Sequence, residues 1–268
     1  MTQAPQTSLL LIGQDMHILN PAFAKTIQKR NQQGLRALAQ AQLDGGAMAL
    51  DINPGPGRDS TDILGWVMET IQEKWPVPLF VPAGTHLPTL LARHRGQATI
   101  NAVTADPATL TDTMKLARDH DADLVVLLTR PGMWSNQQQE QLQIALDVLE
   151  ESDAVGLPLD HLYLDPVFSV RTDPLTWRLS GGMPDLDRVL DLIALIGELT
   201  DGRAHTLLAL SNGTLGLAPE RRSALHCRML PLLAEAGLSA VILNCRDRKL
   251  MEIARNLRVV AKKQQKAA

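Results

Sequence analysis

Several carboxylate and amide side chains share one setting: each ends or follows a short apolar run typical of a β-strand. They are Asp51, Asn101, Asp165, Asn212 and Asn244. A carboxylate can accept two N–H bonds, and an amide both donates and accepts. Such groups suit recognition of a flat, neutral, nitrogen-rich heterocycle. Each buried charge-assisted hydrogen bond of this kind contributes on the order of 1.5–3 kcal/mol.

The clearest case is the run Leu162-Tyr163-Leu164-Asp165-Pro166. Proline lacks an N–H and favours an extended conformation for the residue before it. We therefore expect Asp165 at the tip of a strand and not inside a helix. A loop-capping or helix-capping role for this carboxylate stays open, because Asp favours both positions.

Further polar residues lie close to these strand ends. Asn53 follows Asp51 by two residues, Ser211 precedes Asn212, and Asp15 and His17 lie just beyond the first apolar run. A lone His at such a place is more often structural than catalytic. The sequence holds no Ser/His/Asp set and no cluster of His and carboxylates with metal-ligand spacing, so we expect no metal in this chain.

Eight apolar, strand-like segments alternate with helical segments over the whole length. The predicted strands are 9–12, 47–50, 77–81, 98–100, 123–128, 162–164, 206–210 and 240–243. The predicted helices are 21–44, 59–75, 87–94, 106–120, 137–154, 185–199, 219–236 and 246–261. This alternation predicts parallel strands joined by right-handed crossovers.

Eight such units favour a closed (β/α)8 TIM barrel, α/β in class, formed as a single domain over residues 1–268. An open doubly wound sheet is the alternative, although no strand is followed by the G-x-G-x-x-G of dinucleotide-binding folds. The glutamine-rich stretch 137–143 is expected to be a solvent-exposed helix surface. The long connection 168–184 is expected to be functional or mobile.

Composition excludes several classes of protein. The 268 residues are 45% hydrophobic and carry a net charge of -3, which gives no electrostatic reason to bind nucleic acid or an anionic membrane. Only 3% are aromatic, so the core must consist mainly of aliphatic residues. Cys227 and Cys245 show no ligand spacing and indicate thiols in a reducing, cytoplasmic setting. No apolar run reaches membrane-spanning length.

Five segments, in order along the chain, resemble motifs of the pterin-binding barrel family, most closely the methyltetrahydrofolate:corrinoid/iron–sulfur protein methyltransferases. The similar family motifs are L-D-x-N-x-G-P, I-N-S-x-x-A-E, G-L-P…L-Y-I-D-P, G-L-S-N and C-G-L-D-A. They correspond to residues 50–56, 100–106, 156–166, 208–212 and 236–240.

The resemblance implies a dihydropteroate synthase-like barrel that moves a methyl group between N5 of methyltetrahydrofolate and the cobalt of a corrinoid. The corrinoid (cobalamin type) would be carried by a partner protein, and the chain would form a homodimer. Carried over by position, Asp165 and Asn101 would hold the pterin. Asn212 would be the catalytic residue beside N5. The remaining pterin-binding candidates are Asp51, Asn53, Ser211 and Asn244.

Two departures from the family motifs bear on this reading. The opening G-E-R-x-N of the family reads Gly13-Gln14-Asp15-Met16-His17 here, and a second pterin-binding acid is replaced by Pro82. Asp15 is a candidate to supply the missing charge. Two alternatives follow: a dihydropteroate synthase-like enzyme, and a non-catalytic or altered-ligand barrel serving as a subunit of a methyl-transfer complex.

Overall fold

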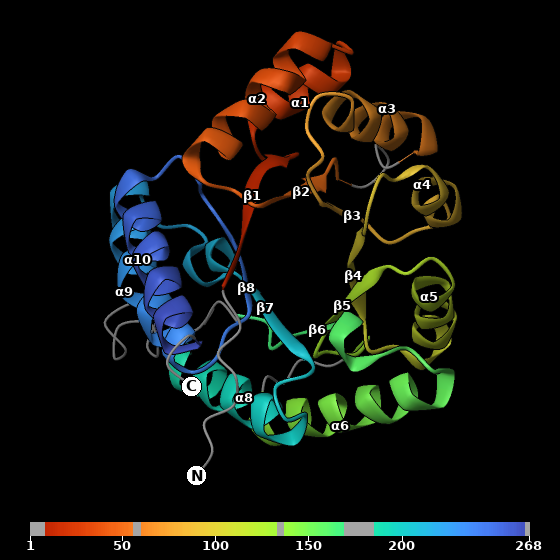
Figure 1. Ribbon diagram of the computed structural model, residues 1–268, viewed down its shortest axis with the longest axis vertical. Coiled ribbons are helices and arrows are strands. Elements are labelled where there is room, and N and C mark those ends of the chain that lie inside the picture. Colours follow the sequence, from red (N-terminus) through yellow and green to blue (C-terminus); the bar gives the residue numbers. More distant parts are fainter. Residues whose placement is uncertain (1–8, 56–59, 133–136, 169–184, 266–268) are drawn as a thin grey trace.

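The computed structural model describes residues 9–55, 60–132, 137–168 and 185–265. Eight parallel strands form a closed barrel in sequence order, as the ribbon shows (Figure 1). They are β1 (Leu10–His17), β2 (Ala49–Asn53), β3 (Leu79–Val81), β4 (Thr99–Thr104), β5 (Asp123–Leu127), β6 (Leu162–Asp165), β7 (His205–Ala209) and β8 (Ala240–Leu243). The predicted (β/α)8 architecture is confirmed, and the open-sheet alternative is wrong.

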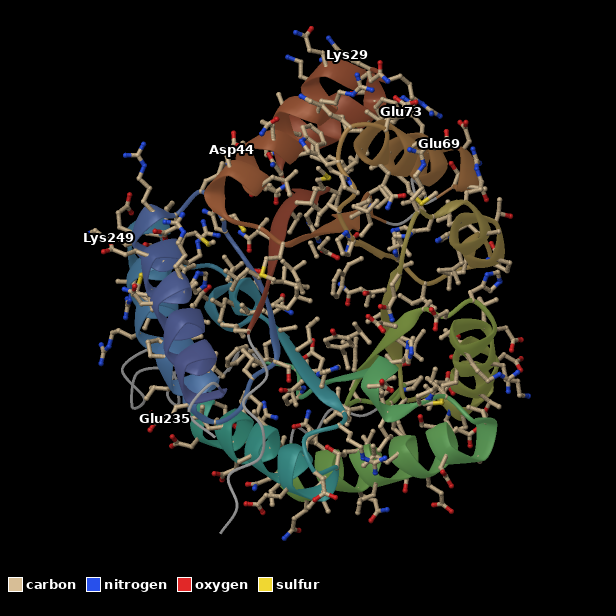
Figure 2. All side chains as sticks on the ribbon, viewed as in Figure 1. Lys29, Asp44, Glu69, Glu73, Glu235 and Lys249 are labelled. Carbon is tan, nitrogen blue, oxygen red and sulfur yellow. The ribbon has the colours of Figure 1, made fainter. Side chains whose placement is uncertain are left out.

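Helices form an outer ring around the strands (Figure 1). They are α1 (Pro21–Gln28), α2 (Gln32–Gly45), α3 (Thr61–Gln72), α4 (Leu87–Arg93), α5 (Pro107–Asp119), α6 (Gln138–Val155), α8 (Leu186–Leu199), α9 (Pro219–Glu235) and α10 (Arg248–Gln265). Two 3-10 turns, η1 (Leu159–His161) and η2 (Leu210–Thr214), flank β6 and β7. Charged side chains such as Glu69 and Lys249 lie on the outside of this ring (Figure 2).

Local signals explain where the helices begin. Ser60 caps α3 by accepting a hydrogen bond from the Ile63 N–H, and Pro107 occupies the first turn of α5. The predicted single helix over 21–44 is wrong, because the structure has two helices there. Asn31 breaks the segment: it is extended, and its side chain accepts from the Gly34 N–H to begin α2.

Strand β1 extends five residues beyond its predicted end at residue 12, so Asp15 and His17 lie inside the strand and not beyond it. Its register with β2 shifts between Gly13 and Met16, which indicates a bulge. The bulge is held from α2, where buried Gln42 accepts the Asp15 N–H at 2.8 Å. Gly13 permits this approach, because a Cβ there would lie 2.4 Å from the Gln42 Oε1.

Most strands contribute at least one inward-facing residue to a cluster that fills the barrel interior. This cluster consists of Ile12, Ala49, Phe80, Val125, Tyr163, Leu207, Ala240 and Ile242. Two larger aliphatic clusters fill the space between the barrel and the helices. The expected aliphatic core is therefore confirmed, although the few aromatics also contribute: Phe80 meets Tyr163 edge-on, with ring centroids 6.4 Å apart.

The glutamine-rich start of α6 is not wholly a solvent-exposed surface. Gln141 is 1% exposed and donates hydrogen bonds to the carbonyl oxygens of Leu128 and Pro166. A buried amide is tolerated here because it satisfies backbone groups that no strand pairs.

In the described part of the chain, no helix is both long and apolar enough to cross a membrane. The predicted long connection lies outside the described residues from 169 to 184. Its first residue, Phe168, is buried.

Candidate active site

Strand alternation directs three of the predicted site residues into the barrel. Asp51 lies two residues after the interior residue Ala49, and Asp165 lies two residues after interior Tyr163. Asp165 is the last residue of β6, and Asp51 lies two residues before the end of β2, so both lie toward the carboxyl side of the barrel, where sites in such folds form. Asn101 reaches Asp51 from β4, across β3, and its Nδ2 donates to Asp51 Oδ1 at 2.8 Å.

Asp165 has spare hydrogen-bonding capacity. It is 5% exposed, and its Oδ1 accepts the Val167 N–H at 2.7 Å. Each carboxylate oxygen has two lone pairs, so the described residues leave one acceptor position on Oδ1 and those on Oδ2 for a ligand. The predicted capping role is thus also present, but it uses only part of this carboxylate.

Burial shifts the titration of both acids. It raises the pKa of Asp165 to about 7, against which the Val167 N–H acts weakly. It also raises the pKa of Asp51 to about 6, with the Asn101 amide acting in the opposite direction. A ligand with N–H donors would therefore bind this site more tightly when these two carboxyl groups are ionised.

These shifts predict how a substitution affects stability. An acid with a raised pKa binds more protons in the folded state, so its ionisation destabilises the fold as pH rises from its ordinary 3.8 through about 7. The Asp165→Asn variant lacks this titration. We expect the free energy of unfolding of the variant, relative to that of the wild type, to increase by roughly 2–4 kcal/mol between pH 4 and pH 8. Urea unfolding at a series of pH values measures it, and a constant difference would contradict the raised pKa.

Three other predicted residues use their side chains in local turns. Asn53 Oδ1 accepts the Gly55 N–H at 3.1 Å, and Asn244 Oδ1 accepts the Arg246 N–H at 3.0 Å. His17, paired in register with Asn53, accepts the Leu19 N–H on Nδ1. The Nδ2 groups of both asparagines make no hydrogen bond to another described residue and can act as donors. Burial lowers the pKa of His17, which favours the neutral imidazole.

Asn212 and Ser211 lie in the 3-10 turn η2, directly after β7. Asn212 is exposed and makes no hydrogen bond to another described residue. The turn itself is firmly held: buried Thr214 and buried His226 of α9 approach to 2.8 Å between Oγ1 and Nε2. Because β6 and β7 pair directly, the turn that carries Asn212 follows the strand next to that of Asp165.

The structure gives Asp15 an ion-pair partner of its own. Arg246, from the loop after β8, places its Nε 2.6 Å from Asp15 Oδ2. Burial raises the pKa of Asp15, and the Arg246 guanidinium lowers it. A ligand that bound Asp15 in place of the missing acid would have to compete with Arg246 for this carboxylate.

Pro82 lies two residues after the interior residue Phe80 and so follows the inward face of β3. Its carbonyl oxygen accepts from Nε2 of buried His86 at 2.9 Å, which fixes the proton on that nitrogen. The turn is thus organised by its backbone, and no carboxylate is present at this position.

One inward residue was not selected from the sequence. Gln14 follows interior Ile12 by two residues, and its Oε1 is buried without a hydrogen-bond partner in the described structure. Buried acceptors without partners are uncommon and mark places where a ligand or water binds. The only sequence signal is the alternation with Ile12, and the predicted strand over 9–12 stops short of Gln14.

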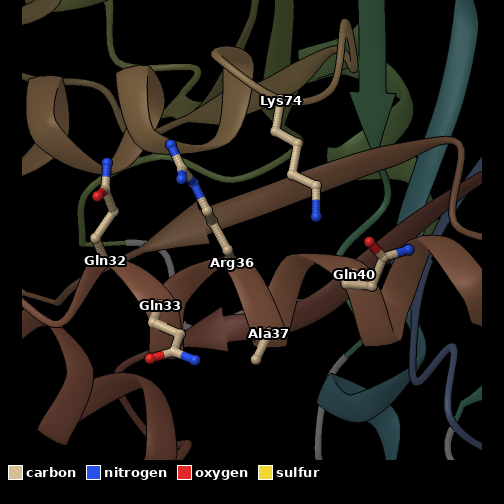
Figure 3. Close-up of a pocket in the computed structure, with 6 residues that line it drawn as sticks. All are labelled: Gln32, Gln33, Arg36, Ala37, Gln40 and Lys74. Atoms are coloured by element: carbon tan, nitrogen blue, oxygen red, sulfur yellow. The ribbon is translucent and has the colours of Figure 1, made fainter.

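A pocket of about 350 Å³ lies elsewhere, along α2 (Figure 3). Its lining is Gln32, Gln33, Arg36, Ala37, Gln40 and Lys74. It contains no carboxylate or strand-end residue, and Arg36 is paired with Glu73 at 2.6 Å. Among the residues that the structure describes, no cluster of His, Cys, Asp or Glu could hold a metal ion. The inward strand ends therefore remain the candidate site.

Comparisons with known proteins agree with the barrel. No protein-family model matches the chain. A methylcorrinoid:tetrahydrofolate methyltransferase of Eubacterium limosum is 22% identical over 163 residues, which are 59% of this chain and 60% of that protein. The matched region therefore spans less than two thirds of that curated relative.

Solved structures match over almost the whole length. A Yersinia pestis dihydropteroate synthase with a pterine–sulfa conjugate has a TM-score of 0.66 at 15% identity, covering 95% of each chain. The Xanthomonas albilineans dihydropteroate synthase in complex with 7,8-dihydropteroate has a TM-score of 0.66 at 13% identity, covering 94% of this chain and 93% of that one. This chain has the dihydropteroate synthase fold.

The fold expected from the sequence motifs is thereby confirmed. In a dihydropteroate synthase-like barrel, the inward strand ends that carry Asp51, Asn101 and Asp165 form the mouth. Identities of 13–15% show the fold alone, so the reaction must be argued from these side chains.

Proposed function

We propose that this protein moves a methyl group between N5 of a tetrahydrofolate and the cobalt of a corrinoid carried by a partner protein. The observation that carries the proposal is Asp165: a buried carboxylate at the mouth of a dihydropteroate synthase-like barrel, with acceptor positions that no described residue occupies. The similarity to a methylcorrinoid:tetrahydrofolate methyltransferase supports the same reaction.

In this proposal Asp165 accepts N–H bonds from the amino-pyrimidine edge of the pterin. The Asn101–Asp51 pair, joined at 2.8 Å, presents a further acceptor and a further donor from the opposite part of the mouth. Ring N–H donors stabilise the ionised forms of both acids, so binding lowers their raised pKa values. Asn53, Asn244 and Ser211 supply additional polar contacts.

Asn212 acts on the reacting nitrogen. A tertiary amine is a poor leaving group, and a donor to N5 that strengthens as the N–methyl bond breaks favours the transition state. The Asn212 amide can donate but cannot release a proton, so N5 is protonated from solvent or through a relay. The partner's corrinoid supplies the methyl acceptor or donor, depending on direction.

Pro82 favours a second candidate, a non-catalytic or altered-ligand barrel within a methyl-transfer complex. A dihydropteroate synthase activity is less well supported, because it needs cations for a pyrophosphate leaving group. Arg130 is paired with Asp147 at 2.5 Å, and Arg246 is paired with Asp15.

Two measurements separate these functions. Calorimetry with methyltetrahydrofolate tests pterin binding, and transfer is then measured to cob(I)alamin and, in reverse, from methylcobalamin to tetrahydrofolate. Transfer in either direction supports the proposal. Binding without transfer supports the non-catalytic subunit, and absence of binding overturns the pterin assignment.

The missing acid gives a prediction of its own. Pro82→Asp should tighten methyltetrahydrofolate binding about 5- to 30-fold, the range of one recovered charge-assisted hydrogen bond of about 1–2 kcal/mol. The position follows the inward face, and the His86 contact uses only the carbonyl of residue 82. Calorimetry of the variant checks this.

The matched control is Pro78→Asp, an exposed proline before β3 at the other end of the strand, which should leave affinity unchanged. A folded Pro82→Asp variant with wild-type affinity would argue against a conventional pterin pose.

The corrinoid protein partner, the homodimer and the cytoplasmic location stay predictions. Co-purification with a corrinoid protein and light scattering of the isolated chain test the first two.

A further inference from the structure

The turn after β6 has an unusual backbone. Pro166 offers no N–H, and Val167 adopts a φ of 52°, in the left-handed region. A β-branched residue rarely adopts this conformation, which persists only where surrounding contacts hold it. The same Val167 donates its N–H to the Asp165 carboxylate at 2.7 Å. The conformation of Val167 therefore determines how Asp165 is held.

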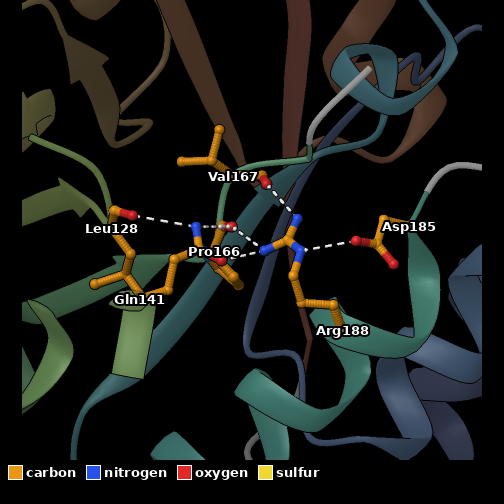
Figure 4. Close-up of polar contacts among 6 residues, drawn as sticks. All are labelled: Leu128, Gln141, Pro166, Val167, Asp185 and Arg188. Atoms are coloured by element: carbon orange, nitrogen blue, oxygen red, sulfur yellow. Dashed lines mark hydrogen bonds and ion pairs between the residues drawn. The ribbon is translucent and has the colours of Figure 1, made fainter. Parts of the chain in front are cut away.

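Two buried polar side chains hold the carbonyl groups of this turn (Figure 4). Arg188 of α8 is 7% exposed and donates to Pro166 O at 3.2 Å and to Val167 O at 3.0 Å. Gln141 of α6 donates to Pro166 O at 2.8 Å and also accepts from Arg188. The Nε of Arg188 also lies 3.1 Å from Oδ2 of Asp185.

Such a network is an inefficient way to stabilise a fold. Burying a guanidinium carries a desolvation penalty, and well-packed apolar residues of similar volume often serve stability equally well. The network instead fixes the geometry of the backbone. Arg188 and Gln141 donate hydrogen bonds to the carbonyl oxygens of Pro166 and Val167. Neither residue follows a strand of the mouth, so neither belongs to the set of strand-end ligands.

We propose that Arg188 and Gln141 are positioning residues that hold Val167 in its left-handed conformation, so that its N–H orients the Asp165 carboxylate for a ligand. The effect on ligand binding rests on the proposed pterin site. The effect on the Asp165 carboxylate does not, because it exists in the free protein.

Arg188→Lys tests the proposal. Lysine keeps the positive charge beside Asp185 but cannot reach all the acceptors that the guanidinium contacts. Methyltetrahydrofolate affinity should fall about tenfold. In the free protein, carboxyl-carbon NMR titration should show the pKa of Asp165 rising, because the Val167 N–H that stabilises its ionised form is lost. The substitution keeps a positive charge at position 188 and leaves Asp185 and Asp51, the other buried acid of the mouth, unchanged. A rise in the pKa of Asp165 would therefore report a change in the geometry of the turn and not a change in nearby charge.

Arg118→Lys is the matched control. Arg118 also binds a backbone carbonyl and an aspartate, Val155 O at 2.6 Å and Asp119 at 2.6 Å, but at the end of α5. Arg118→Lys should change neither the methyltetrahydrofolate affinity nor the Asp165 titration.

A rescue experiment separates positioning from general stability. Val167→Gly, added to Arg188→Lys, should recover at least threefold in affinity, because glycine adopts positive φ readily.

Arg188→Lys with wild-type affinity and an unchanged Asp165 titration overturns the proposal. If Arg188→Lys does not fold, Gln141→Leu carries the same two readouts, with an expected affinity loss of about threefold. If the wild type binds no pterin, the proposed function fails, and the NMR titration alone decides the positioning role.

Discussion

Asp165→Ala is expected to abolish methyltetrahydrofolate binding, with a loss of at least 100-fold by calorimetry. The side chain is buried, matches the family motif and, unlike Asp51, is not bonded to another side chain among the described residues. Removing it leaves the N–H groups of a buried pterin edge without partners, which is more damaging than losing one exposed bond. Affinity within about threefold of wild type, roughly 0.6 kcal/mol, would refute the central assignment.

Asp165→Asn should be nearly as damaging for binding, although it stabilises the free protein. The amide has one acceptor oxygen, and that oxygen can keep the Val167 bond; its Nδ2 then points donors at a ligand edge that is itself rich in donors. A variant that unfolds at higher urea but no longer binds separates loss of recognition from loss of fold.

Asp123→Asn is the matched control. Asp123 is a partly buried acid whose pKa is also raised by desolvation, but it lies at the start of β5, where it contacts His161 and Gln97. This is the opposite end of the barrel from the mouth. Asp123→Asn should therefore leave methyltetrahydrofolate affinity within twofold of wild type, and an equal loss would show that the effect is not local to the mouth.

The fold could be predicted because its signals are local and repeated. Each short apolar run is a strand, each following amphipathic segment is a helix, and local caps such as Ser60 and Asp106 begin these helices in the structure. The extension of β1 could not be predicted in the same way. It depends on Gln42 of α2 binding the Asp15 N–H, a contact between residues 27 positions apart.

The candidate site was predictable in its residue types and less so in its contacts. The position of Asp51, Asn101 and Asp165 at or after apolar runs predicts that they lie near one another, because parallel strands of a barrel all end at one mouth. The Asn101–Asp51 bond joins β2 and β4 across the short strand β3, which no local pattern encodes.

Gln141 and Arg188 escaped prediction for a related reason. A glutamine among glutamines and an arginine in a helix normally face water. The bonds of Gln141 and Arg188 to the carbonyls of Pro166 and Val167 appear only once α6 and α8 pack against the turn.

Asn212→Ala is expected to lower the methyl-transfer rate about 30- to 100-fold while changing methyltetrahydrofolate affinity less than threefold. The donor is proposed to act on N5, whose hydrogen-bonding strength grows only as the N–methyl bond breaks. An interaction made mainly in the transition state lowers kcat and kcat/KM together and leaves ground-state binding intact. Single-turnover transfer and calorimetry on the same preparation give the two numbers.

The exposed position of Asn212 makes this test clean. Its side chain has no hydrogen-bond partner among the described residues, and the η2 turn is held by the contact of Thr214 with His226, so alanine should not disturb the turn. Asn256→Ala, on the exposed surface of α10, is the matched control and should leave both rate and affinity unchanged. Equal losses of rate and affinity in Asn212→Ala would make it an ordinary binding residue. The leaving nitrogen would then have to be stabilised by solvent or by another donor of the mouth. The next candidates are the Nδ2 groups of Asn53 and Asn244, which no described residue binds.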